Sequence, residues 1–273
     1  EWPQRVSLEA PLVAVGWLTA LAGAHGLLLM PEVYAGLFGV VWAIYLIDRI
    51  LDAGGWLSGR PWTARHHFCF RHRRTLLLGV LPVLVGLSAW LAFFRVPGVL
   101  LWHCLGIAGV VAGYLGWHVM IRGKVAAEGR ECSKSLLASA LFALGVCAGV
   151  YAHEYWYSGW AMVAGEVLLT GLFGTNLFGL AILERERAGQ GVKQLEMARL
   201  AIRWVTLAVA LVVWLPLPEP DQPLRLLALS VVVGVVVMSA LHVRRAGLSE
   251  ISYRCLVDAV LLAAAGLLYG LSG

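Results

Sequence analysis

Residues 224–243 read LRLLALSVVVGVVVMSALHV, and Arg225 is the one charged side chain among them. A helix of about 20 mostly apolar residues is long enough to cross the hydrocarbon core of a bilayer. This stretch therefore predicts a membrane-spanning helix.

Similar apolar stretches recur along the whole chain. Hydrophobic residues make up 60% of the 273 residues and charged residues 14%, and the mean hydropathy is +0.79. A soluble domain of this length carries about a quarter charged residues. The sequence therefore predicts an all-α integral membrane protein of about nine transmembrane helices, in a single transmembrane domain over residues 1–273. The other expected spans are 9–29, 33–52, 75–94, 98–120, 134–151, 159–183, 199–216 and 254–271.

The cysteines and the net charge exclude several other classes of protein. The chain has five cysteines, an odd number with no CxxC spacing, which argues against a disulfide framework or a zinc site. The pI of about 9.1 is best explained by loop charges that face anionic lipid head groups. We therefore expect membrane lipids as partners and no nucleic acid.

Positive charge is concentrated in alternate loops, which predicts the orientation of the chain. Cytoplasmic loops of membrane proteins carry an excess of lysine and arginine. The loops on one side hold only Arg95 and Arg225, so we expect the N-terminus inside and the C-terminus outside. The basic residues of the other four loops are Arg60, Arg65, Arg71, Arg73, Arg74, Arg122, Lys124, Arg130, Lys134, Arg185, Arg187, Lys193, Arg199, Arg244, Arg245 and Arg254.

A first polar cluster, YLIDRILD at residues 45–52, closes the second expected span. Ionisable residues in spans are costly, and each is a candidate for function. Asp48 and Asp52 are four residues apart and share one helix face. Two such carboxylates can share a magnesium ion, which prefers oxygen ligands. Alternatively, Asp48, Arg49 and Asp52 form ion pairs that end the helix at the membrane interface.

A second polar cluster closes the sixth expected span. Asn176 and Glu184 are eight residues apart and so lie on nearly the same helix face. Glu184 is either a ligand or an interface charge beside Arg185. An unpaired amide in hydrocarbon is expensive, so Asn176 needs a partner. That partner is either a ligand or a neighbouring helix.

The loop between these clusters is rich in arginine and histidine. Residues 60–74 read RPWTARHHFCFRHRR. Arginine binds phosphate oxygens in a bidentate manner, so the loop suits a diphosphate or an anionic head group. Positive-inside topology explains the same arginines without a ligand. Elsewhere, Asp258 is expected to pair with Arg254 on its own helix, and His103 and His118 are weaker candidates for ligation of a pigment.

On these motifs, the chain resembles the UbiA superfamily of intramembrane prenyltransferases, in particular a divergent bacterial branch of UbiA-like proteins. The residues that carry the resemblance are Tyr45-Leu-x-Asp48-Arg49-x-Leu-Asp52, Arg65-His66-x-Phe68, Lys134 at the start of a small-residue helix, Asn176 to Glu186, and Arg254 to Asp258. The resemblance covers most of the chain. It implies a UbiA-like bundle of nine helices, an inside N-terminus and a place in the bacterial inner (cytoplasmic) membrane.

Active members of that superfamily bind magnesium and an isoprenyl diphosphate through aspartate motifs on spans 2 and 6. The last two aspartates of the first motif fall on Asp48 and Asp52, but its opening Asn-Asp falls on Ile44 and Tyr45. The second motif falls on Asn176, Leu180 and Glu184 and contains no aspartate. Both motifs are therefore incomplete.

Two hypotheses of function remain open. In the first, the protein is a magnesium-dependent transferase that uses an isoprenoid diphosphate. Asp48, Asp52 and Glu184 would then hold Mg²⁺; Arg65, His66 and Lys134 would contact the diphosphate; and Asn176 would orient ligand or metal water. In the second, the protein is a non-catalytic UbiA-like scaffold that binds a quinone, a pigment or a lipid, as a subunit of a larger membrane complex or alone.

Overall fold

The structure is a computed structural model of the chain, and it describes residues 8–54, 64–120, 127–152, 159–215 and 222–272. All secondary structure in these ranges is helical, and no strand occurs among them. The predicted all-α class is therefore confirmed.

Within the described ranges, eight helices are long and apolar enough to cross a membrane. A shorter apolar helix, α2 (Glu9–Ala24), precedes them. Its 16 residues extend over about 24 Å, less than the roughly 30 Å of hydrocarbon that a perpendicular span must cross. The eight long helices are α3 (Pro31–Gly54), the continuous run of α5, η2 and α6 (Arg73–Phe94), α7 (Gly98–Met120), α8 (Ala127–Tyr151), α9 (Gly159–Arg187), α10 (Lys193–Trp214), α11 (Gln222–Val243) and α12 (Glu250–Ser272).

The helix boundaries show where hydropathy alone was insufficient. We expected a span at 134–151, but α8 begins at Ala127, because a polar first turn with Glu128 is helical as well.

A glycine ends α2. Gly26 adopts a φ of 63°, a conformation that favours glycine. The Leu27 N–H then donates to the Ala22 carbonyl at 2.8 Å, which closes the helix end.

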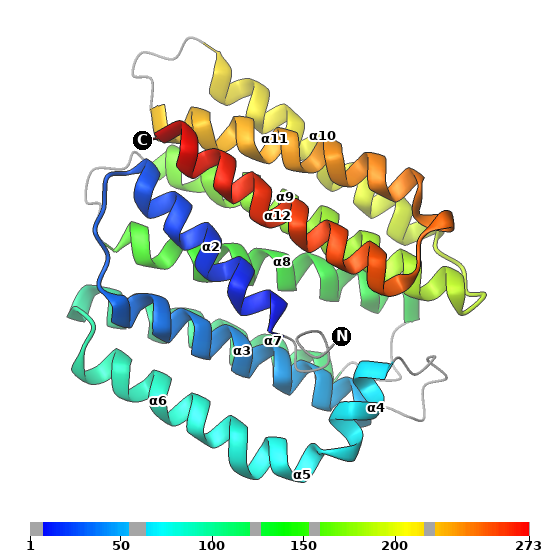
Figure 1. The fold of residues 1–273 in the computed structure, drawn as a ribbon, viewed down its shortest axis with the longest axis horizontal. Helices are drawn as coiled ribbons and strands as arrows, with labels where there is room; N and C mark the ends of the chain where they lie inside the picture. The colour runs from blue at the N-terminus through cyan, green and yellow to red at the C-terminus, as the bar shows by residue number, and fades with distance from the viewer. Residues whose placement is uncertain (1–7, 55–63, 121–126, 153–158, 216–221, 273) are drawn as a thin grey trace.

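The helices form one bundle in which α9 is the most enclosed. Buried residues make up 72% of its membrane-spanning window, and it packs against α8, α10 and α11. The last helix, α12, packs against α11 and against the first helix, α2 (Figure 1). The core lies where these helices meet, and the edge-to-face pair of Trp17 and Phe173 is part of it, with 6.0 Å between ring centroids.

Close approach of α10 to α9 depends on a glycine. A Cβ atom at Gly171 would lie only 1.7 Å from the Thr206 hydroxyl oxygen. Small residues allow membrane helices to approach closely, so no larger residue fits here without moving α10.

The connections with most of the basic residues lie at one end of the bundle. The chain passes from α3 to α6, from α9 to α10 and from α11 to α12 at this end, to the right in Figure 1. The helix α4 (Ala64–Arg71) and the single turn η3 (Arg245–Gly247) are also there. We call it the basic end. The clustering agrees with positive-inside topology, and the direction of the chain in the membrane stays a prediction.

Candidate functional site

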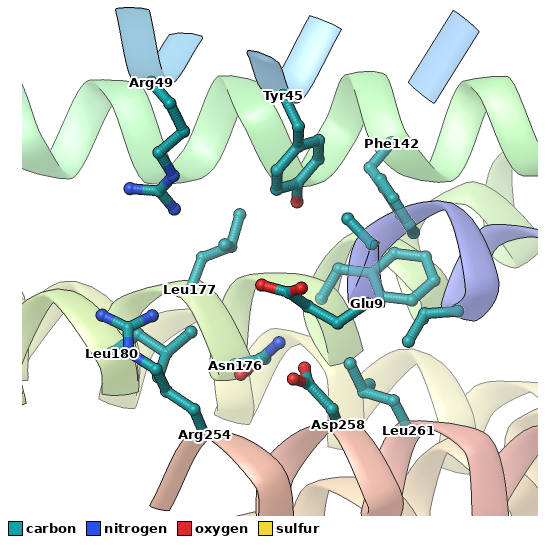
Figure 2. A pocket seen from close by; sticks show the side chains of 13 residues that line it. Glu9, Tyr45, Arg49, Phe142, Asn176, Leu177, Leu180, Arg254, Asp258 and Leu261 are labelled. Atoms are coloured by element: carbon teal, nitrogen blue, oxygen red, sulfur yellow. The ribbon is translucent and has the colours of Figure 1, made fainter. Parts of the chain in front are cut away.

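A pocket lies between α2, α3, α8, α9 and α12 (Figure 2). It holds about 590 Å³ of empty space, open space at its mouth included. Sites between helices of a bundle are common places for small ligands. The lining residues are Glu9, Ala10, Val13, Tyr45, Arg49, Phe142, Phe173, Asn176, Leu177, Leu180, Arg254, Asp258 and Leu261.

Helix register arranges this lining in three layers. On α12, Arg254 and Asp258 are one turn apart, which separates their Cα atoms by about 6 Å along the helix. On α3, Arg49 and Tyr45 have the same spacing. The two arginines lie together on one side of the pocket and form its cationic layer (Figure 2).

The second layer is acidic and polar. It holds Glu9 from the first turn of α2, Tyr45 from α3, Asn176 from α9 and Asp258 from α12. Figure 2 shows the Tyr45 hydroxyl pointing toward the Glu9 carboxylate, and the Asn176 amide lying between the Glu9 and Asp258 carboxylates. Four helices thus bring hydrogen-bonding groups to one level of the pocket.

The third layer is an aromatic and aliphatic floor. Phe142 of α8 lies edge-to-face with Tyr45 at 6.4 Å and with Phe173 of α9 at 4.6 Å between ring centroids. Edge-to-face aromatic pairs add about 0.5–1.5 kcal/mol beyond the burial of their area. The floor is therefore apolar, and it belongs to the same pocket as the layer of carboxylates.

The Asn176 side chain brings a buried hydrogen-bond acceptor without a partner to the pocket. It is 8% exposed, and its Oδ1 atom has no hydrogen-bond partner. A buried polar atom without a partner costs roughly 1–3 kcal/mol. The Oδ1 atom thus remains available to a ligand, and both roles that the sequence left open for Asn176 stay predictions.

Arg254 is held in place by carboxylates on both sides. Its guanidinium donates to Glu184 of α9 and, through Nε, to Glu250 one turn earlier on α12 at 3.1 Å. The residue is 6% exposed. Paired in this way, a buried arginine can still direct its remaining N–H groups into the pocket.

Asp48 is also held by a cation. The Lys134 Nζ atom of α8 lies 2.9 Å from the Asp48 Oδ1 atom of α3, and the side chains are 11% and 17% exposed, respectively. Two of the three carboxylates predicted to bind magnesium, Asp48 and Glu184, therefore carry cationic partners from other helices.

As they stand, the described residues do not fit a magnesium ion. Magnesium needs several oxygen ligands that are not already bound to cations. In the part of the chain that the structure describes, no group of three or more His, Cys, Asp or Glu side chains is arranged so that it could hold a metal ion. Asp52 in α3 and Arg65 and His66 in α4 have side chains outside the described residues. The magnesium site and the diphosphate contacts of the basic loop stay predictions.

A separate ionic cluster at the basic end stabilises the connections between helices. Arg245 donates to the Glu186 carboxylate at 2.8 and 2.6 Å and to Glu196 at 2.9 Å. The hydrogen bond to Glu186 raises the pKa of Arg245 above its usual value. His242 lies 3.0 Å from Glu196 and 3.3 Å from the Tyr253 hydroxyl. The cluster joins α9, α10, α11 and α12, and it accounts for His242 without a pigment.

Of the other intramembrane histidines, His103 contacts its own helix, with Nδ1 2.8 Å from the Val99 carbonyl oxygen. The side chain of His118 lies outside the described residues. Pigment ligation by His103 or His118 stays a prediction.

Sequence reasoning missed Glu9 altogether. An acidic residue in the first turn of a helix is common, because it interacts favourably with the helix dipole, and nothing else in the sequence distinguishes Glu9. Asp258 was expected to form only an intrahelical ion pair, but it also lines the pocket. These roles depend on the packing of α2 and α12 against α3 and α9.

Comparison of the chain with protein-family models, with curated proteins and with solved structures found no match.

Proposed function

We propose that this chain is a UbiA-like integral membrane protein whose central pocket binds the head group of an amphipathic molecule, such as an isoprenoid, a quinone or another lipid. The observation that carries the proposal is Asn176, whose buried Oδ1 atom lacks a partner in a pocket lined by two arginines and a tyrosine. Because Oδ1 is an acceptor, it is stabilised by a ligand that donates a hydrogen bond, such as a hydroxyl of a reduced quinone or an ammonium group.

The layering of the pocket supports an amphipathic ligand over a purely polar one. Arg49, Arg254 and the Tyr45 hydroxyl can donate hydrogen bonds to a head group, while Phe142 and Phe173 offer an apolar surface below it. Sites of this kind combine a largely apolar lining with a few convergent polar groups. An amphipathic ligand dissolves in the bilayer. A protein with eight helices long and apolar enough to span that bilayer is therefore surrounded by such ligands.

A magnesium-dependent prenyltransferase is the second candidate. It is favoured by the position of Asp48 and Glu184 on α3 and α9, the two helices on which the predicted motifs fall. In that case Asp48 and Glu184 would have to release Lys134 and Arg254. The requirement for magnesium separates the two candidates, because only the transferase needs the metal in order to bind its diphosphate substrate.

The test is a calorimetric titration of the purified protein in lipid nanodiscs. The probes are geranylgeranyl thiodiphosphate, which resists hydrolysis, and a short-chain quinone in its reduced form, whose hydroxyls can donate to Asn176, each with and without magnesium. Saturable binding of either probe without magnesium, unchanged in Asp48→Ala, is the result expected for a binding protein. Binding that needs magnesium and is lost in Asp48→Ala supports the transferase. Absence of binding by both probes under all conditions would overturn the proposal.

A further inference from the structure

The charges that line the pocket are separated by sign. Arg49 and Arg254 form one layer, and Glu9 and Asp258 form the next layer toward the aromatic floor (Figure 2). The two layers are about one helical turn apart, or about 6 Å along α12. A separation of this size matches a head group in which opposite charges are joined by a few covalent bonds.

Given the proposed function, we infer that the head group bound here is dipolar. Its phosphate contacts Arg49 and Arg254, and its ammonium group contacts the Glu9 and Asp258 carboxylates. The chemical class is a phosphoethanolamine, either as the head group of a membrane lipid or as a free soluble molecule.

The charge balance of the pocket favours this class over a simple anion. The two arginines and two carboxylates of the lining sum to zero. Arg254 is already bound by Glu184 and Glu250, which makes the surroundings of the cationic layer more acidic still. A diphosphate alone would bring several negative charges close to these carboxylates in a medium of low dielectric constant, where repulsion is strong. A head group with one charge of each sign adds no net charge to the pocket.

The Asn176 amide also favours the ammonium group. An ammonium ion has three N–H donors and no acceptor, so it needs three oxygen acceptors around it. The Glu9 and Asp258 carboxylates provide two from α2 and α12, and the Asn176 amide lies between them. Its Oδ1 atom, which has no partner, becomes the third acceptor when the amide turns to face the ligand.

The aromatic floor limits how deep the ligand reaches. Phe142 and Phe173 pack edge-to-face and give the pocket lining an apolar surface next to its polar layer. The phosphate and the chain that it carries therefore lie toward the arginines, and the ammonium is the innermost group.

The experiment compares amphiphiles that share one acyl chain and differ in charge. Isothermal titration in detergent measures the affinity for lysophosphatidylethanolamine, lysophosphatidic acid and an alkylamine of matched length, together with free phosphoethanolamine. The proteins are the wild type, Asp258→Asn and the control Ser239→Ala. Ser239 bonds only to the Val235 carbonyl of its own helix at 2.7 Å and lies outside the pocket. Thermal unfolding in the same detergent checks that each variant is folded.

The wild type is expected to bind lysophosphatidylethanolamine at least tenfold more tightly than lysophosphatidic acid or the alkylamine. Asp258→Asn should remove the preference over lysophosphatidic acid, and Ser239→Ala should keep it. If free phosphoethanolamine binds as tightly as lysophosphatidylethanolamine, the site is dipolar and its ligand is a soluble molecule. If free phosphoethanolamine binds more weakly, the ligand is the membrane lipid.

Two results would overturn the inference in distinguishable ways. If the wild type binds lysophosphatidic acid or the alkylamine as tightly as the zwitterionic lysolipid, the pocket does not select a head group with both charges. The pocket then still binds amphiphiles. If the wild type binds none of these probes and neither the quinone nor the thiodiphosphate, the proposed function fails together with the inference.

Discussion

Lys134 of α8 and Asp48 of α3 form a largely buried ion pair with 2.9 Å between Nζ and Oδ1. The sequence assigned these residues to a diphosphate and to a metal, but the structure joins them to each other. The pair links α3 to α8, as does the edge-to-face pair of Tyr45 and Phe142.

The ion pair predicts strong coupling between its partners. Lys134→Met leaves the Asp48 carboxylate buried without its cation and should lower the free energy of unfolding by about 1–3 kcal/mol. Asp48→Asn should destabilise as well, and the double variant should lose less than the sum of the two single losses. Thermal unfolding in detergent measures all three variants. Purely additive losses would show that the pair contributes nothing as a pair.

The pairing of Glu184 with Arg254 predicts an effect on ligand binding. Glu184→Gln removes one carboxylate from the Arg254 guanidinium and leaves Glu250 in place. More of the positive charge of Arg254 is then available to the pocket. The affinity for geranylgeranyl thiodiphosphate without magnesium should rise about threefold to tenfold, which corresponds to at most about 1.4 kcal/mol. A fall in that affinity would instead assign Glu184 to the binding of the ligand through a metal.

The contact of Gly171 with Thr206 predicts a steric effect on the packing of α9 against α10. Gly171→Ala places a methyl group onto the Thr206 side chain and should destabilise the protein, and Thr206→Ala in the same chain should restore part of the loss. The matched control is Gly109→Ala on α7, where no atom lies within 4 Å of the added Cβ. The control should be neutral or stabilising by about 0.5–1 kcal/mol, because alanine favours a helix. Equal effects at both positions would contradict the close approach.

The ionic cluster at the basic end predicts a local effect rather than a global one. Arg245→Gln leaves the Glu186 and Glu196 carboxylates without their shared cation, so the connection between α11 and α12 should open more often. Limited proteolysis should cut this connection several times faster than in the wild type. The neighbouring exposed Arg244, changed to Gln, is the control and should leave the rate unchanged. Identical rates in both variants would mean that the cluster does not hold the connection closed.

Much of the fold could be predicted from the sequence, because hydropathy is a local property. Eight of the nine expected spans correspond to helices that are long and apolar enough, and the first expected span, 9–29, corresponds to the shorter α2. The start of α8 at Ala127 was missed because its first turn is polar. Helix length depends there on backbone hydrogen bonds, which hydropathy does not report.

The site was less predictable, because it depends on which helices meet. Asn176 was singled out correctly as a buried amide that needs a partner, since its cost in hydrocarbon follows from its position alone. The partners of Asp48 and Glu184 could not be foreseen. Lys134 is 86 residues from Asp48 along the chain, and Arg254 is 70 residues from Glu184, so only the packing of the bundle brings them together.

The central claim is that the Asn176 Oδ1 atom, which has no partner in the pocket, accepts a hydrogen bond from a bound ligand. The most direct measurement compares the wild type with Asn176→Leu for both thermal stability and affinity for the amphiphile that binds the wild type best. We predict that Asn176→Leu is at least as stable as the wild type without ligand, because a buried polar atom without a partner has been removed. Its affinity should fall about tenfold or more, and the ligand should no longer raise its melting temperature. A variant that is less stable without ligand, yet binds as tightly as the wild type, would show that Asn176 is structural and would contradict the account.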